Sequence, residues 1–356
     1  MNFLLILAVG LVMGCAGKFQ YYDPQKPHRT KDGFVNNYDN SPRPSVWKWR
    51  WERLWTNFPE DPPEGAPTEK ISLGSLHLKR TRALTWFGQS SVLVQLQGVN
   101  VLTDPIFSSR ASPVSFAGPK RYGDLPIEMN ELPHIDVVVI SHNHYDHMDL
   151  PTLKALQMYG LGKTRFLVPL GLKKLLEDEG LTNVTEFDWW ESTVIGPLHL
   201  TFTPVQHWSA RSLWDQNLTL WGGWMISVPK FQVFFAGDSG YSKDFQDIYE
   251  RLGAPDLALL PIGAYAPRWF MKHMHMDTAE AVKVHQDLHA KLSVPIHWGT
   301  FKLSDEPLLE PPEKLRDSIK KANLSESVFH IMKRGETLLL EDNELKNGLW
   351  YESVQN

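Results

Sequence analysis

The chain has 356 residues, of which 42% are apolar and 22% are charged, a composition that is typical of a globular protein and excludes wholesale disorder. Its formal net charge is −5, so it lacks the basic excess that drives general nucleic-acid binding, and nucleic acid is not expected as its ligand. Cys15 is the only cysteine, which excludes an intrachain disulfide and a thiolate-based zinc site. Any metal must therefore be held by histidines and carboxylates.

The apolar run at the N-terminus predicts an export signal. Phe3–Gly14 is too short to cross a bilayer as a mature helix, but it fits the core of a signal peptide. The residues that precede Cys15 resemble the cleavage box of bacterial lipoproteins. We expect residues 1–15 to be a lipoprotein-type signal peptide, with Cys15 anchoring the protein to the outer membrane of the cell envelope. An ordinary signal peptide and a buried N-terminal strand are the alternatives.

Residues 16–75 predict an irregular N-terminal extension that contains one tryptophan-rich helix. The extension is rich in Pro, Asn, Asp and Lys and shows little periodicity. Within it, Trp47, Trp51, Leu54 and Trp55 fall on one face of a helix. This face either packs on the core or lies in a membrane interface, where Trp and basic side chains are favoured.

Residues 76–345 show strands that alternate with helices, which predicts a layered α/β domain, and residues 346–356 are left as a C-terminal tail. The predicted strands are Ser91–Gln97, Asn100–Thr103, Ile135–Ile140, Leu198–Thr203, Gln232–Phe235, Leu257–Pro261 and Leu292–Ile296. The predicted helices are Leu150–Tyr159, Gly171–Glu179, Phe245–Leu252, Thr278–Leu288 and Pro312–Asn323.

Four potential metal ligands follow the predicted strand Ile135–Ile140 within six residues. His142 and His144 are two residues apart in extended chain, so they point the same way and can chelate one ion. Asp146 and His147 come directly afterwards and can hold a second ion. Imidazole nitrogen and carboxylate oxygen both suit Zn²⁺. The whole pattern is much more specific than a single His-x-His, so the sequence predicts a metal site here.

Three further candidate ligands, His207, Asp238 and His297, each lie just past the end of a predicted strand. Strand ends on one edge of a layered sheet converge, and such folds place their active sites there. Gly237 permits a tight turn before Asp238. We therefore expect these three side chains to complete a two-metal site.

These residues, in this order, resemble the metallo-β-lactamase superfamily, and several longer strings resemble one family within it. That family is the N-acylphosphatidylethanolamine-hydrolysing phospholipases D, and the similarity runs from about Phe34 to about residue 315. The strings are Thr103–Pro113, Gly118–Arg121, Asp188–Glu191, Gly263–Tyr265, Pro267–Lys272 and His297–Phe301.

The resemblance implies an αββα sandwich with two zinc ions per chain. Carried over by position, one zinc ion would have three histidine ligands, His142, His144 and His207. The other would have three ligands of its own, Asp146, His147 and His297. Asp238 would bridge the two ions, and His275 would lie beside the substrate phosphate. The resemblance also implies a phospholipid substrate and suggests a homodimer.

Two positions depart from the family pattern. Gln89 stands where the family usually has a histidine that is not a metal ligand, so the departure concerns the surroundings of the ligands. Ala266 replaces a common glutamate and concerns the rim of the pocket. Asp104, at a predicted strand end, is expected to support a ligand histidine or to cap a turn.

The expected activity is a phospholipase D reaction that uses a metal-activated hydroxide and yields phosphatidic acid and an N-acylethanolamine. We count Asp146, Asp238 and His275 as its catalytic residues. The alternative is a lactonase or other carboxylic ester hydrolase with a soluble substrate. A third possibility is a zinc-stabilised adaptor without activity, but a structural zinc site usually closes with four ligands.

Overall fold

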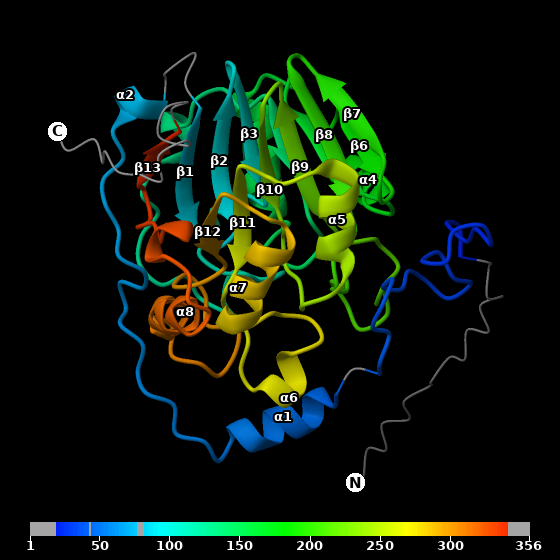
Figure 1. The fold of residues 1–356 in the computed structure, drawn as a ribbon. Coiled ribbons are helices and arrows are strands. Elements are labelled where there is room, and N and C mark those ends of the chain that lie inside the picture. Colours follow the sequence, from blue (N-terminus) through cyan, green and yellow to red (C-terminus); the bar gives the residue numbers. More distant parts are fainter. Residues whose placement is uncertain (1–18, 43, 77–81, 341–356) are drawn as a thin grey trace, which may run out of the picture.

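Two β-sheets lie face to face at the centre of the molecule, and helices cover their outer faces (Figure 1). The structure is a computed structural model that describes residues 19–42, 44–76 and 82–340. Cys15, its signal-like segment and the predicted tail 346–356 lie outside these residues. Within the described part of the chain, no helix is long and apolar enough to span a membrane.

The first sheet has seven strands, of which β1 to β3 are antiparallel and β3 to β6 are parallel. Its order is β13 (Thr337–Leu339), β1 (Ala83–Gly88), β2 (Ser91–Leu96), β3 (Val99–Thr103), β4 (Val137–Val139), β5 (Arg165–Pro169) and β6 (Val184–Phe187). The short strand β13 comes from the C-terminal part of the chain and pairs with β1, with Leu84 opposite Leu338.

The second sheet has six strands, in which β10, β11 and β12 are parallel to one another. Its order is β12 (Leu292–Ile296), β11 (Leu257–Pro261), β10 (Phe231–Phe235), β9 (Gly223–Val228), β8 (Leu198–Thr203) and β7 (Ser192–Ile195). Strands β8 and β10 both run antiparallel to β9, so they point the same way. The C-terminal ends of β8, β10 and β12 therefore share one edge.

The alternation of side chains along the strands builds two separate apolar layers. In β4, Val137 and Val139 belong to the large cluster between the sheets, whereas Val138 faces the outer cluster. Because successive residues of a strand point to opposite faces, an uninterrupted apolar run such as this one marks a strand that is buried on both sides. The central strands are therefore positioned from both faces, and so are the loops that follow them.

The helices are divided between the two outer faces. Leu153 and Leu156 of α3 (Leu150–Tyr159) and Leu176 of α4 (Lys173–Asp178) pack on the first sheet. The second sheet is covered by α5 (Asp244–Leu252), α7 (Thr278–Asp287) and α8 (Glu310–Lys321). The remaining short elements are α1 (Val46–Arg53), α2 (Leu73–Leu76), α6 (Arg268–Met271) and two 3₁₀ turns, Met129–Glu131 and Glu326–Val328. This arrangement confirms the expected αββα sandwich.

All seven predicted strands and all five predicted helices are present, with ends that differ by a few residues. The sequence analysis missed β1, β5, β6, β7, β9 and β13. Strand β6 is only four residues long and β7 alternates exposed and half-buried side chains, so their apolar signal is weak.

The N-terminal extension is tied to the sandwich by a buried carboxylate. Asp188, at the end of β6, accepts hydrogen bonds from Lys26, from His28 Nε2 at 2.7 Å and from Arg29 at 2.7 Å. Despite its burial, these three partners hold the pKa of Asp188 well below its ordinary value. The extension is thus fixed where it passes the sheet, on its way to the site described below.

The structure contradicts one of the two interpretations of helix α1, in which its tryptophan face packs on the core. Trp47, Trp51 and Trp55 are 73%, 63% and 76% exposed, so the predicted apolar face does not lie on the core. Trp49, on another face, makes the contact instead. Its ring stacks on Phe270 of α6 at 4.8 Å, and its Nε1 donates to Asp305 at 2.9 Å. The prediction that the face with Trp47, Trp51 and Trp55 packs on the core is therefore wrong.

Candidate metal centre

The predicted ligands come from loops that begin at the C-terminal ends of strands. The loop after β4 carries His142, His144, Asp146 and His147, and the loops after β8, β10 and β12 carry the others. Because these strand ends converge on one edge, the structure brings all seven side chains into two adjacent groups. One group is His142, His144 and His207. The other is Asp146, His147, Asp238 and His297. In each group, one ligand atom from every residue lies within 4.8 Å of the others.

Gly237 allows Asp238 to approach the first sheet. Its φ is +61°, and a Cβ atom at this position would lie 2.4 Å from Cβ of Ser141. Any larger residue would therefore push the loop after β10 away from the loop after β4. The predicted role of this glycine in a tight turn is consistent with that geometry.

The three histidines of the first group have their imidazole nitrogens in close contact. His142 Nε2 lies 2.8 Å from His144 Nδ1, and His207 Nε2 lies 3.3 Å from the same atom. His142 and His207 are almost fully buried, whereas His144 is half-buried. The first group therefore offers three imidazole nitrogens as potential metal ligands, and His144 is the most exposed of the three residues.

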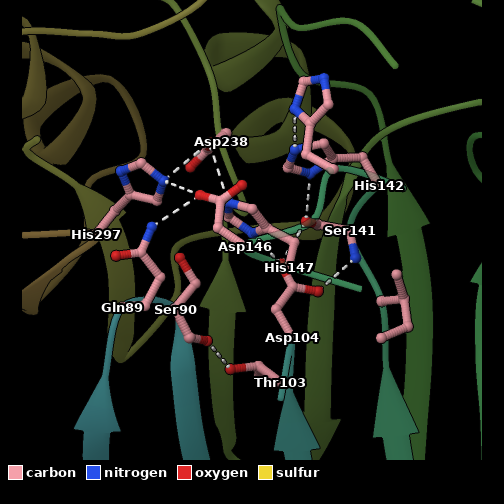
Figure 2. A network of polar contacts seen from close by, with 12 residues as sticks. Gln89, Ser90, Thr103, Asp104, Ser141, His142, Asp146, His147, Asp238 and His297 are labelled. Atoms are coloured by element: carbon pink, nitrogen blue, oxygen red, sulfur yellow. Dashed lines mark hydrogen bonds and ion pairs between the residues drawn. The ribbon is translucent and has the colours of Figure 1, made fainter. Parts of the chain in front are cut away.

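The second group surrounds the Oδ2 atoms of Asp146 and Asp238 (Figure 2). His147 Nε2 lies 3.2 Å from Asp146 Oδ2 and 3.1 Å from Asp238 Oδ2. His297 Nε2 lies 3.1 Å from each of the same two oxygens. His297 has a φ of +61°, a backbone conformation that residues other than glycine seldom adopt and that is often found at functional sites.

His275 lies beside the centre and joins the two groups. Its Nδ1 is 3.7 Å from Asp238 Oδ2, and its ring centroid is 5.2 Å from that of His207. His207, Asp238 and His275 also form a set whose ligand atoms lie within 4.8 Å of one another. His275 is thus positioned to contact a molecule that is bound at the centre.

The outward-facing nitrogens of three candidate ligand histidines are held by hydrogen bonds. Asp104 Oδ2 accepts from His147 Nδ1 at 2.7 Å, the contact expected if Asp104 supports a candidate ligand histidine. Ser141 Oγ lies 2.8 Å from His142 Nδ1 and itself donates to Asp104. The backbone carbonyl of Met274 accepts from His207 Nδ1 at 2.8 Å. Each of these bonds leaves the Nε2 lone pair directed toward the centre.

Gln89 adds a further support. Its Nε2 donates to Asp146 Oδ2 at 2.8 Å, and it comes from the turn between β1 and β2 (Figure 2). Gln89 has a φ of +51°, and its own carbonyl accepts from Trp86 Nε1 and from the backbone of His297. One residue is thereby connected to two predicted ligands.

Burial and mutual charge give the centre a mixed electrostatic character. Burial lowers the pKa of His144 to about 3 and that of His275 to about 4. Burial also opposes charge on His297, but Asp238 and Asp146 outweigh it and raise its pKa to about 9. The two carboxylates are in turn held well below their ordinary pKa by His147 and His297, despite their burial. They therefore stay ionised near neutral pH.

Several buried polar atoms at the centre have no hydrogen-bond partner among the residues that the structure describes. They are His144 Nε2, His147 Nε2, Asp238 Oδ1, His275 Nδ1 and His297 Nδ1. A buried polar group without a partner is costly, so such a concentration in one place calls for a ligand. Histidine nitrogens and carboxylate oxygens are the donors that Zn²⁺ takes, and the residues present therefore fit a metal centre.

Comparison with known proteins places this centre in a family. Residues 99–298 match a family model described as a beta-lactamase superfamily domain. An N-acyl-phosphatidylethanolamine-hydrolyzing phospholipase D of Caenorhabditis elegans is 40% identical over 282 residues, which cover 76% of this chain and 79% of that protein. The chain belongs to this phospholipase D family of the metallo-β-lactamase superfamily. A Saccharomyces cerevisiae protein described as a mitochondrial N-acyl-phosphatidylethanolamine-hydrolyzing phospholipase D is 41% identical over 65% of this chain and 50% of its own length.

A solved structure agrees with the fold. A metallo hydrolase from the archaeon Ignicoccus hospitalis superposes with a TM-score of 0.56 and 25% identity, covering 73% of this chain and 99% of that one. Family and fold together identify the chain as a metal-dependent hydrolase of the metallo-β-lactamase superfamily.

Sequence reasoning missed three supports of the centre. Ser141 directly precedes the histidine motif, but a serine at a strand end carries no specific signal. The carbonyl of Met274 belongs to the backbone and leaves no trace in the sequence. Gln89 was noticed only as a departure from the family, and its bond to Asp146 depends on how the β1–β2 turn lies against the loop after β4.

Proposed function

We propose that this protein is a zinc-dependent phospholipase D that hydrolyses N-acylphosphatidylethanolamine, or a related phospholipid, to phosphatidic acid and an N-acylethanolamine. The single observation that carries the proposal is the position of Asp238, which belongs to the second group of potential ligands and also lies within 4.8 Å of His207 of the first group. The relationship to the Caenorhabditis elegans phospholipase D, at 40% identity over most of both chains, supports the substrate class.

In this proposal, His142, His144 and His207 would hold one zinc ion, and Asp146, His147 and His297 would hold the other. Asp238 would serve both sites. Bound zinc ions would lower the pKa of water and neutralise charge on a phosphoryl group. His147 and His142 are kept in the required tautomer by Asp104 and Ser141, so the protein orients its ligands before any ion arrives.

The chain's own residues also position the substrate. Asp238 Oδ1 is buried and has no hydrogen-bond partner within the described part of the chain, so it can accept a hydrogen bond from the attacking water and direct that water at phosphorus. His275, at 3.7 Å from Asp238, can donate a hydrogen bond to a phosphoryl oxygen or to the departing alkoxide. Burial of this edge limits access of bulk water to the reacting groups.

The setting that we propose is a membrane. A phospholipid substrate resides in a bilayer, and an anchor at Cys15 would keep the protein on the outer membrane of a bacterial envelope. The anchor and the substrate are independent proposals, because the first depends on an N-terminal segment outside the described residues.

The test is hydrolysis of a lipid and lactone panel by the zinc-loaded protein in ¹⁸O-water, with products identified by mass spectrometry. We expect phosphatidic acid that carries the label in its phosphate, and unlabelled N-acylethanolamine, because attack at phosphorus expels the ethanolamine oxygen. Label in the alcohol would indicate attack at carbon, and diacylglycerol would indicate cleavage on the other side of phosphorus. Release of a fatty acid or opening of lactones would favour the carboxylic ester hydrolase instead.

A further inference from the structure

Helix α1 exposes a set of large apolar side chains on a surface that nothing in the described chain covers. Trp47, Trp51, Leu54 and Trp55 are each more than 60% exposed, and α1 contains no buried residue. The helix is held to the body through Trp49 and Arg53, which contact Phe270 and Asp305. Three exposed tryptophans, two on one short helix and one in the turn directly after it, are costly in water, so this surface is suited to a partner.

Two loops expose apolar side chains in the same way. Leu213 and Trp214 are 89% and 87% exposed in the loop that follows His207. Phe116 is 81% exposed at the tip of the loop formed by residues 108–120. We call the exposed side chains Trp47, Trp51, Trp55, Phe116, Leu213 and Trp214 the apolar rim.

The two loops of the apolar rim are both bonded to the loop that carries the metal-centre histidines. Arg211, two residues before Leu213, donates to the carbonyls of Asn143 and Met148, and its own carbonyl accepts from Tyr145. Ser108, where the other loop begins, donates to Asp149. Both loops therefore flank residues 141–149.

Helix α1 reaches the same edge through α6. Trp49 stacks on Phe270, and the segment after α6 carries Met274 and His275, whose neighbours are His207 and Asp238. In Figure 1, α1 and α6 lie side by side at the lower edge of the molecule. The apolar rim thus comes from two loops that are bonded to the metal loop and from a helix that packs on α6, the element before His275.

Two of these three segments carry a charge opposite to that of the whole chain, whereas the loop with Leu213 and Trp214 holds one cation, Arg211, and one carboxylate, Asp215. Residues 46–55 contain three cations, Lys48, Arg50 and Arg53, and one carboxylate, while the chain carries a net charge of −5. The loop of residues 108–120 contains Arg110 and Lys120 and no carboxylate. Tryptophan combined with basic side chains suits the headgroup region of an anionic bilayer, where the ring is half in hydrocarbon and the cation meets lipid phosphate.

We propose that the apolar rim docks the protein on an anionic phospholipid surface, with the metal centre directed at that surface; this inference rests on the proposed lipid substrate. A bilayer fits three separate tips that surround the centre, because each can insert on its own. A protein partner on the same tips would block access to the centre. The docking is independent of an anchor at Cys15, which would tether the chain without orienting it.

The experiment uses the fact that Cys15 is the only cysteine. In a Cys15→Ser background of the full chain, Trp55→Cys, Phe116→Cys and Trp214→Cys are each labelled with an environment-sensitive fluorophore. Leu161→Cys is the matched control, because Leu161 is 82% exposed just beyond the far end of α3, which starts next to the metal loop and runs about 15 Å away from it. Vesicles of phosphatidylcholine, with or without phosphatidylglycerol, are then added.

We expect a blue shift at all three rim positions with the anionic vesicles, a weaker shift without phosphatidylglycerol, and none at position 161. Adding Trp47→Ala and Trp51→Ala should raise the lipid concentration needed for the shift at position 214 at least about tenfold, since two large aromatic surfaces are lost. Thermal melting of each variant checks that it is folded. Because the signal comes from the fluorophore and not from a reaction product, docking is measured separately from turnover.

Three outcomes would overturn the proposal. A chain that shows no shift at the rim with any vesicle does not dock through it. An equal shift at position 161 means non-specific adsorption. A shift that needs no vesicles but grows with protein concentration means that a second copy of the chain covers the rim.

Discussion

Gln89 Nε2 donates a hydrogen bond to Asp146 Oδ2 over 2.8 Å, at an oxygen that also faces His147 and His297. An amide cannot change its charge, so this support persists at every pH, unlike that of the histidine that the family usually has at this position. The bond fixes the orientation of a carboxylate that we propose as a zinc ligand.

Loss of the Gln89 support should weaken metal binding. We expect Gln89→Ala to lower zinc affinity about 10- to 100-fold, the usual effect of removing a partner of a ligand. Competition with a chelator measures this directly. Gln95→Ala is the control, because Gln95 is also buried but bonds to Leu76 and Asn100 away from the centre. Equal zinc affinities for Gln89→Ala and Gln95→Ala would show that Gln89 does not support the metal ligands.

Two zinc ions per chain are expected by elemental analysis. Asp238→Asn keeps the size of the side chain but removes the charge that both ions share, and we expect activity to fall on the order of 10²- to 10³-fold. The melting temperature should change little. Asp256→Asn, at a buried aspartate that bonds to Gln232 and Lys291, should leave the zinc content intact. Active protein with one metal or none would contradict the two-ion proposal.

His275→Ala should slow turnover about 10²- to 10⁴-fold, because it removes a hydrogen bond to the phosphoryl group or to the leaving oxygen. The zinc content should not change, since His275 is not one of the seven proposed ligands. His285 is a suitable comparison, as it is buried and bonds to Ser293 far from the centre. If His275→Ala and His285→Ala had the same kinetics, His275 would have no part in the reaction.

The hydrogen bonds that Asp188 accepts from Lys26, His28 and Arg29 should make the stability of the fold depend on pH. The folded-state pKa of Asp188 is depressed, so it contributes stability above its unfolded pKa of about 4, and this contribution is lost as the pH falls below that value. We expect Asp188→Asn to lower the free energy of unfolding by about 2 kcal/mol at pH 7 and by progressively less in acid. Denaturant titration at several pH values measures this. Asp178→Asn, which breaks an exposed pair with Lys174, should cost less than about 0.5 kcal/mol.

Lipidation of Cys15 has its own test. If Cys15 is acylated, the protein should incorporate labelled palmitate and partition into detergent when it is expressed in bacteria. Cys15→Ser should abolish both. A chain that is exported in unlipidated form, cut elsewhere or left uncut, would contradict the anchor and leave the proposed enzyme activity unaffected.

Local sequence was sufficient wherever the signal lies in neighbouring residues. The run Ile135–Ile140 predicted a strand, and the following histidines and aspartate predicted a metal loop, because an apolar run and ligand spacing are both set along a single segment. His207, Asp238 and His297 could be named because each follows a strand end. The resemblance of the longer sequence strings to the family then implied the αββα sandwich, which the two facing sheets confirm.

Only the tertiary structure decided how these segments meet. The bond from Gln89 to Asp146 and the carbonyl of Met274 on His207 join residues 57 and 67 positions apart, and no local pattern encodes such a contact. Helix α1 shows the same limit. Its periodicity identified an apolar face correctly, but whether that face meets the core or the exterior depends on which side of the helix α6 occupies. Phe270 and Asp305 capture Trp49, and the face with Trp47, Trp51 and Trp55 is left outside.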